Sequence, residues 1–416
     1  MRSLSQIFLS ALLAAACLSS AQADPHTIKF SGWAPQAGKS RVTSGNDNQL
    51  PAGCWADREI LSGGKQEGVE LLSIYNGRLI ITVIPTRGMS VLRAEDTQNP
   101  GFKLGWDSPV KQVVHPQFMD LESRGGLGWL EGFNEWMCRC GLEYAGHPGV
   151  DEFTTNTGDI SKTTLTLHGK IGNIPAQRAA ISVEKDGDKT KLAITGDVSE
   201  HMFFGPKLSL STKLWTEPNA DWFVIEDKVQ NVGASEQEFQ LIYHANYGVP
   251  LLGEGAKVLV PFKSVTPMNA GAAKAVQTYS TYKGPTPGFT EEVFLVEPLS
   301  EKGATLAVLK DATGEKATSI RWQTSELPHL TIWKNTAATA DGYVTGIEPA
   351  TGYPFNRKIE RKFGRVPKLK PNEARSFSLK FQVHHGKDSV KALEQEVTRL
   401  QSKAPGTINT EPPKTE

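Results

Sequence analysis

Residues 225–244 read IEDKVQNVGASEQEFQLIYH, and this stretch contains most of what decides the fold. In IEDKVQ every second residue, Glu226, Lys228 and Gln230, is polar, which is typical of a β-strand with one exposed face. The segment NVGA then interrupts the alternation as a turn does, and EFQLIYH returns to a strand-like pattern. The stretch therefore predicts two strands joined by a short turn.

Similar strand-like runs recur along the chain at short intervals, with Gly and Pro residues spread between them. Helical spacing is convincing only in residues 389–403, where Val390, Leu393, Val397 and Leu400 fall three or four residues apart. Since strands and helices do not alternate, the pattern predicts an all-β fold, a large antiparallel β-sandwich over residues 24–388. We expect the helix at 389–403 to follow it, and a Pro- and Thr-rich disordered tail at 404–416. The strands are expected at residues 78–85, 163–168, 191–195, 222–229, 237–243, 304–310, 330–334 and 375–384.

The N-terminal residues 1–23 have the pattern of a secretory signal peptide. Arg2 precedes an apolar run at residues 7–18, and Ala21-Gln22-Ala23 forms a small-x-small cleavage site before Asp24. Cys17 leaves open an alternative, lipid anchoring, although the residues before it match a lipoprotein site poorly. The sequence therefore predicts a secreted or periplasmic protein, and no other segment is apolar and long enough to predict a transmembrane span.

The content of charged residues limits which classes of partner the protein is expected to bind. Acidic and basic residues number 45 each, and the basic residues form no stripe along the sequence. Nucleic acid and anionic membrane surfaces are therefore poor candidates for partners. Nothing in the sequence indicates an oligomeric state.

Three cysteines, Cys54, Cys138 and Cys140, follow the predicted signal peptide. No further Cys or His lies near them at metal-ligand spacing, so we expect no metal site. We expect buried thiols that pack as small apolar groups, with a disulfide to Cys54 as the open alternative.

Three short segments place a polar residue capable of acid–base chemistry at the end of a predicted strand. They are LHGKIGN with His168, LIYHANYGVP with His244, and GIEPATGYPFNR with Glu348. Two imidazoles and one carboxylate can move a proton from one oxygen to another near neutral pH. Pro349 cannot continue a strand ladder, so we expect Glu348 to project into a loop. The structural alternatives are a core histidine, a capping histidine and a rim ion pair of Glu348 with Arg357 or Lys358.

These segments resemble those of the aldose 1-epimerase (galactose mutarotase) superfamily, in a less-studied secreted branch. The resemblance covers most of residues 60–385 in order and includes PTRGM at 85–89, LGWDSP at 104–109 and GWLEGF at 128–133. It departs from the family where Lys170 replaces a second Gly after His168. The Asp with which the family binds sugar has no clear counterpart here.

The resemblance implies a galactose mutarotase-like sandwich that binds a mono- or oligosaccharide and interconverts the α and β anomers of a free sugar. Glu348 then corresponds to the general base, His244 to the acid and His168 to a sugar-binding residue. The chemistry implied requires neither a metal ion nor another cofactor. The alternatives are a lyase or glycoside hydrolase on the same scaffold, and a carbohydrate-binding protein without catalysis.

Five further residues are candidates for sugar binding. Arg87 and Arg357 have planar forks suited to hydroxyls or a carboxylate, and the Trp333 ring suits stacking on a sugar. Asn246 and Asn173 supply amides beside the two histidines. The structural alternatives are a core position for Trp333 and, for the cations, contact with solvent or pairing with Glu131, Glu143 or Glu360. Because Arg87, Lys170 and Arg357 flank the site segments, a further hypothesis is that acidic sugars are accepted at least as well as neutral ones.

Overall fold

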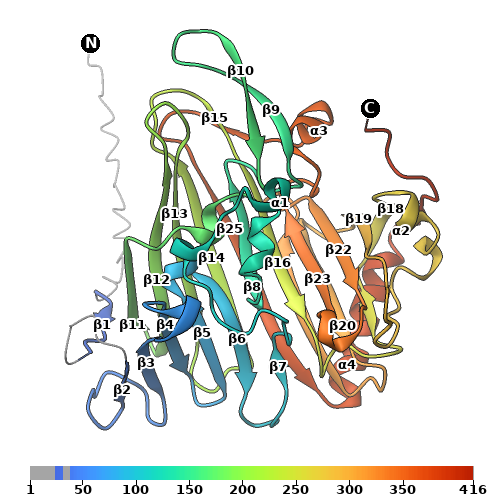
Figure 1. Cartoon of the computed structure of the whole chain (residues 1–416). Helices are drawn as coiled ribbons and strands as arrows, with labels where there is room; N and C mark the ends of the chain where they lie inside the picture. The colour runs from blue at the N-terminus through green and yellow to red at the C-terminus, as the bar shows by residue number, and fades with distance from the viewer. Residues whose placement is uncertain (1–23, 31–37, 416) are drawn as a thin grey trace, which may run out of the picture.

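Two large β-sheets packed face to face make up the protein (Figure 1). This computed structural model describes residues 24–30 and 38–415. One sheet has nine strands, in the order β1 (His26–Thr27), β11 (Arg178–Asp186), β12 (Lys189–His201), β13 (Lys207–Thr216), β14 (Trp222–Asn231), β25 (Ala374–His385), β21 (Lys316–Gln323), β20 (Ala304–Lys310) and β17 (Lys257–Leu259). Its neighbouring strands are antiparallel, so the predicted all-β antiparallel sandwich is confirmed.

The second sheet has thirteen strands and carries His244 and Glu348. Its order is β2 (Gly38–Thr43), β3 (Trp55–Ile60), β4 (Glu70–Tyr75), β5 (Leu79–Ile84), β6 (Ser90–Asp96), β8 (Met137–Leu142), β16 (Gln240–Tyr247), β23 (Val344–Ala350), β22 (His329–Asn335), β19 (Glu292–Pro298), β18 (Phe262–Pro267) and β26 (Thr407–Ile408), with β7 (Lys103–Leu104) beside β6. Two small ribbons lie outside these sheets, β9 (Gly149–Thr154) with β10 (Ile160–Leu165), and β15 (Gln237–Glu238) with β24 (Lys368–Leu369).

The two strands predicted in residues 225–244 exist, but they lie in opposite sheets. β14 pairs with β13 and β25, whereas β16 pairs with β8 and β23. The single strand expected at 237–243 is split at Phe239, whose backbone N–H donates to the carbonyl of Pro367. The chain therefore uses β15 to cross from one sheet to the other.

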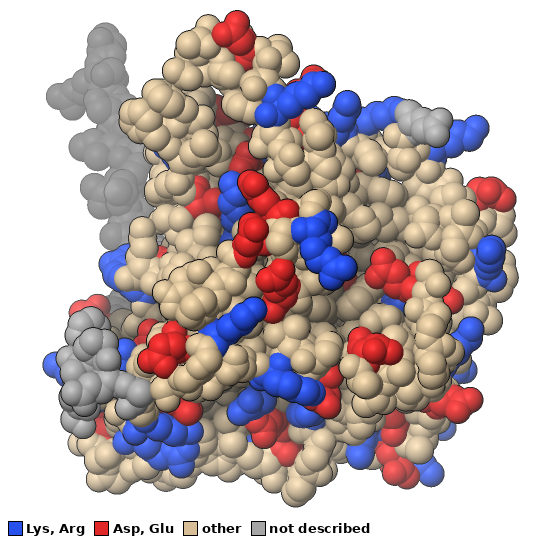
Figure 2. Space-filling view, viewed as in Figure 1, with Lys and Arg blue, Asp and Glu red and all other residues tan. Residues whose placement is uncertain are grey.

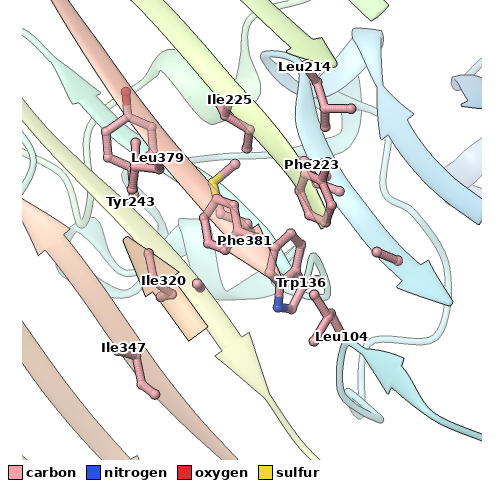
Figure 3. Close-up of a cluster of buried hydrophobic side chains, with 14 of the residues drawn as sticks. Leu104, Trp136, Leu214, Phe223, Ile225, Tyr243, Ile320, Ile347, Leu379 and Phe381 are labelled. Carbon is pink, nitrogen blue, oxygen red and sulfur yellow. The ribbon is translucent and has the colours of Figure 1, made fainter. Parts of the chain in front are cut away.

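Alternation along each strand fills the space between the sheets. Trp136, Phe223 and Phe381 meet there, the last two with ring centroids 5.4 Å apart (Figure 3). In β16, Leu241, Tyr243, Ala245 and Tyr247 join this core, so His244 and Asn246 point to the opposite face of the sheet. Each fully buried large apolar side chain contributes roughly 1.5–3 kcal/mol, so the core fixes which strand residues face outward.

The C-terminal helix α4 (Lys387–Gln401) begins two residues earlier than predicted. Its four spaced apolar residues pack on Leu306, Val308 and Ala317, on the outer face of the nine-stranded sheet. The predicted disordered tail is wrong at residues 407–409, because β26 pairs with β18 and the Asn409 amide donates to Thr266. The remaining helices are short: α1 (Ser123–Gly126), α2 (Ala270–Ala273), α3 (Arg357–Lys362), and the 3₁₀ turns η1 (Gly64–Gln66), η2 (Pro85–Arg87), η3 (Pro116–Phe118), η4 (Gly128–Glu131), η5 (Ile171–Asn173), η6 (Val276–Thr278) and η7 (Thr339–Asp341).

The structure bears on the cysteine predictions but not on the N-terminal one. The predicted signal peptide, with Cys17, lies outside the described residues. Cys54, Cys138 and Cys140 are buried free thiols, so the alternative of a disulfide to Cys54 is wrong. Within residues 24–30 and 38–415, no helix has the length and apolar character that a membrane crossing requires.

Candidate functional site

The site lies on the face of the thirteen-stranded sheet that points away from the nine-stranded sheet. Adjacent strands β8, β16, β23 and β22 form its floor. Ala245 pairs with Ile347, and Ile242 with Ala350, so this register sets His244 across from Glu348 on neighbouring strands. The expectation that Glu348 projects into a loop is wrong, because β23 continues through Pro349 to Ala350. The sequence thus brings the predicted acid and base together through strand pairing over about one hundred residues of separation.

His244 and Glu348 contact each other directly. The Nε2 atom of His244 lies 3.3 Å from Oε1 of Glu348, and both side chains are almost fully buried, 5% and 2% exposed. The two atoms form no hydrogen bond in this arrangement, and Oε1 has no hydrogen-bond partner among the described residues. A Cβ atom at Gly346 would lie 2.2 Å from this oxygen, so glycine is required for the carboxylate to fold over the strand.

Asn246 fixes the orientation of the His244 ring. Its amide nitrogen donates to the carbonyls of His244 and Glu135, which leaves its Oδ1 as the acceptor 2.7 Å from Nδ1 of His244. The neutral imidazole therefore carries its proton on Nδ1 and turns the Nε2 lone pair toward Glu348. Asn246 is a positioning residue in this geometry.

His168 lies in a turn after β10 rather than in the strand predicted at 163–168. Its backbone is left-handed, with φ at 61°, a conformation in which His is enriched among residues other than Gly. Nδ1 lies 3.0 Å from the carbonyl of Ala145 and must donate to it, so Nε2 is an acceptor. The ring centroids of His168 and His244 are 5.1 Å apart, so all three predicted residues converge.

Aromatic rings cover the two histidines. Trp129, in η4, lies 4.6 Å from the His168 ring and 5.7 Å from the His244 ring, centroid to centroid. Phe133 and Trp333 lie 5.5 and 5.6 Å from the His244 ring. Trp333 was predicted as a binding residue, whereas Trp129 and Phe133 were missed, although GWLEGF combined aromatic residues with glycines in a loop.

Burial shifts the pKa values of Glu348, His244 and His168 in the directions that favour their uncharged forms. It raises the pKa of Glu348 well above its usual value, with a smaller contribution from the charge of Glu291. It lowers the pKa of His244 to about 4 and the pKa of His168 well below 6.5, the latter with repulsion from His244. Burial therefore favours the carboxylic acid form of Glu348 and the uncharged form of both imidazoles, and in these forms the His244–Glu348 pair holds one exchangeable proton between Oε1 and Nε2.

Both predicted arginines are close to the site segments, but their charges are already paired. Nη2 of Arg87 lies 2.7 Å from Glu135, and Nη1 donates to the carbonyl of Gly132, next to Phe133. Nε of Arg357 donates to Asp151 at 2.7 Å, and its Nη1 donates to the carbonyl of Glu143. Each guanidinium is therefore held by a carboxylate.

The remaining candidates differ in what they contact. Asn173, at the end of η5, has both amide atoms buried without a partner among the described residues. Two residues near the rim were missed by sequence reasoning, His147 and Glu291. Glu291 accepts a hydrogen bond from Trp333 at 2.8 Å, and His147 is near enough to lower the pKa of His168. The Gly- and Pro-rich segment AGHPG is the signal that could have identified His147.

A hollow of about 1410 Å³ lies elsewhere, where β11–β14 meet β3 and β4. Two ion pairs line it, Arg58 with Glu70 and Arg178 with Asp197, and in each pair the opposite charges cancel. It contains none of the residues predicted for the site, and in the described part of the chain no cluster of three metal-ligating side chains occurs. On the face drawn in Figure 2, acidic and basic side chains are interspersed rather than gathered into one stripe.

Known proteins resemble the chain in family and in fold. A family model described as "Domain of unknown function (DUF4432)" matches residues 66–383. A candidate aldose 1-epimerase from Klebsiella pneumoniae is 40% identical over 91% of this chain and 96% of its own, with a TM-score of 0.83. A galactose mutarotase-like protein from Clostridium acetobutylicum is 18% identical over 80% of this chain and 98% of its own, with a TM-score of 0.53, which concerns the fold alone.

No curated protein matches the chain. The family match covers well over half of the sequence, and the Klebsiella pneumoniae protein aligns over nearly all of both chains. The resemblance to aldose 1-epimerase-like proteins is therefore confirmed for family and fold. The chain belongs to the DUF4432 family and has the galactose mutarotase-like β-sandwich fold.

Proposed function

We propose that the protein binds a free sugar at this site and interconverts its α and β anomers, with His244 and Glu348 as the acid–base pair. The observation that supports this most is the 3.3 Å contact between His244 Nε2 and Glu348 Oε1. A base must act on O1 of the sugar and an acid on the ring oxygen. Because both oxygens are bonded to the same anomeric carbon, the base and the acid must lie close together.

The proton count of the pair suits the reaction. Passing the proton from Glu348 to Nε2 of His244 produces a carboxylate and an imidazolium, with no proton taken from solvent. The carboxylate then removes the proton from O1 of the sugar, while Nε2–H protonates the ring oxygen. The bond from C1 to the ring oxygen breaks as C1=O forms, and rotation about C1–C2 followed by the reverse steps gives the other anomer.

His168 serves binding in this scheme. Since its Nδ1 donates to the carbonyl of Ala145, its Nε2 is free to accept a sugar hydroxyl beside His244. The aromatic rings of Trp129, Phe133 and Trp333 supply apolar surface for the sugar ring.

Access to the pair requires movement. Trp129 and Phe133 lie over His244, and Glu348 is nearly inaccessible to solvent. The loop that carries these two rings must therefore shift when a sugar enters.

Anomer exchange, measured by NMR or polarimetry on a panel of free sugars, tests the proposal. The expected result is faster exchange with no change in the mass of the sugar. An unsaturated product indicates a lyase and cleavage of a glycoside indicates a hydrolase. Affinity without faster exchange indicates a binding protein, and each of these results contradicts the proposal.

We also propose that the protein is exported, on the basis of the pattern in residues 1–23. The N-terminal sequence of the protein purified from the periplasm or medium tests this, with Asp24 as the expected first residue. Recovery of the intact N-terminus in the cytoplasm contradicts it.

A further inference from the structure

The charges around the site determine which sugars it can accept. Of the three cations that flank the site segments, Arg87 and Arg357 are buried and paired with Glu135 and Asp151. Lys170 is exposed, its backbone amide donates to the carbonyl of Gly141 in β8, and its charge acts on the buried carboxyl of Glu200. The two arginines are therefore poorly placed to receive a carboxylate on a sugar.

Glu291, in contrast, contributes a negative charge at the rim. It precedes β19 in an exposed segment, and its Oε2 accepts the Nε1–H of Trp333 at 2.8 Å. Trp333 in turn lies 5.6 Å from the His244 ring, so Glu291 is one side chain away from the proposed acid. Its charge acts on both Glu348 and His147.

We infer that Glu291 is a specificity-determining residue that disfavours sugars carrying a carboxylate and admits neutral ones. This inference rests on the proposed function, and it reverses the hypothesis of acidic substrates. A sugar anion in the site would meet the Glu291 carboxylate, and also Glu348 whenever that group is ionised, while Arg87 and Arg357 are already paired with carboxylates. A neutral hexose meets no such repulsion.

Galactose and galacturonate form the sharpest pair of probes, because they differ only in the group at C6. In the variant Glu291→Gln, the amide oxygen still accepts the Trp333 hydrogen bond while the charge is lost. We expect the ratio of kcat/KM for galacturonate to kcat/KM for galactose to rise about fivefold, with galactose itself changed by less than about twofold. The gain should shrink at about 0.5 M salt, because screening already weakens the repulsion in the wild type.

Two controls separate the charge at the rim from other effects. Glu291→Asp keeps the charge and should keep the wild-type ratio. Asp388→Asn makes the same change in net charge on α4, on the opposite side of the sandwich, and should leave the ratio unchanged. A wild type that prefers galacturonate, or an unchanged ratio in Glu291→Gln, overturns the inference.

The outcome for Glu291 can be told apart from the outcome for catalysis. If no anomer exchange is seen, calorimetric binding of the same two sugars to the same variants gives the ratio. Selectivity without turnover retains the role of Glu291 and contradicts the proposed catalysis. Turnover without charge selectivity retains the catalysis and overturns the role of Glu291, and no binding of either sugar overturns both.

Discussion

At the scale of single residues, the pair of His244 and Glu348 is the part of the molecule on which the proposed chemistry depends. Glu348→Gln preserves the shape of the side chain and removes the base. We expect the anomer-exchange rate to fall by ~10²–10⁴-fold, the usual loss for a positioned acid–base group. His115→Asn is the matched control, because His115 only caps η3 through Gln117, and its effect should be small. Equal rates in wild type and Glu348→Gln would show that the base is misidentified.

The pH dependence of the same pair follows from its pKa shifts. The pair holds one proton from the His244 pKa of about 4 up to the raised pKa of Glu348. We expect kcat/KM to be level across this range and to fall below it, where a second proton charges His244. In Asn246→Asp, a carboxylate beside Nδ1 favours the imidazolium, so the acid limb should move to higher pH. An unmoved limb in this variant would contradict the assignment of that limb to His244.

The sequence correctly predicted which residues lie together in the site. It was less successful in predicting which of the candidate side chains are free to bind a sugar. His168, His244 and Glu348 stand in recognisable segments, and the structure brings them together, while their catalytic roles stay predictions. Arg87 and Arg357 looked equally suitable. Their partners could not be read from the sequence, because Asp151 is 206 residues from Arg357 and only the fold brings them into contact.

At the scale of elements, the loop from η3 to Phe133 is the cover of the site. It carries Trp129 and Phe133 inward, and Phe118, Leu127 and Leu130 on its exposed side. We expect its amides to exchange hydrogen faster than those of β16 and β23, and to be protected when a saturating sugar is bound. Mass-spectrometric hydrogen exchange measures both. Equal protection of the loop with and without a bound sugar would contradict its role as a cover.

The sequence predicted where strands occur more successfully than it predicted which strands pair with each other. Alternation placed strands close to β5, β14, β20 and β22, since it reports which side chains face a core. It could not say that β14 and β16 belong to opposite sheets, because sheet membership is decided by distant partners such as β25 and β8. The two-residue strand β26 has no periodicity to detect, and so the tail was predicted to be disordered.

At the scale of the whole molecule, buried histidines govern stability in acid. Burial lowers the pKa of His244, His329 and His384 from 6.5 to about 4. The unfolded chain therefore binds more protons between these values, and stability is lost as pH falls from 6.5 toward 4. We expect the Tm to decrease over this range, less steeply in His329→Gln. A Tm that stays constant across it would contradict the assignment.

The opposite sign applies to Glu200, whose buried carboxyl has a pKa raised to about 7 and accepts the amides of Leu142 and Glu143. Its contribution to stability is lost as pH rises through 7. Between about 4.5 and 6.5, Glu200 therefore offsets part of the effect of the three histidines.

The pairing of β26 with β18 has a consequence for handling the protein. β26 is the last strand of its sheet, and Asn409 also donates its backbone amide to Val265 of β18. A chain shortened to end at Ala404 would leave β18 as an uncovered edge strand, open to pairing with the edge of another molecule. We expect that shortened chain to self-associate, as light scattering and size-exclusion chromatography would show. A chain ending at Thr410 keeps β26 and should self-associate no more than the full-length chain.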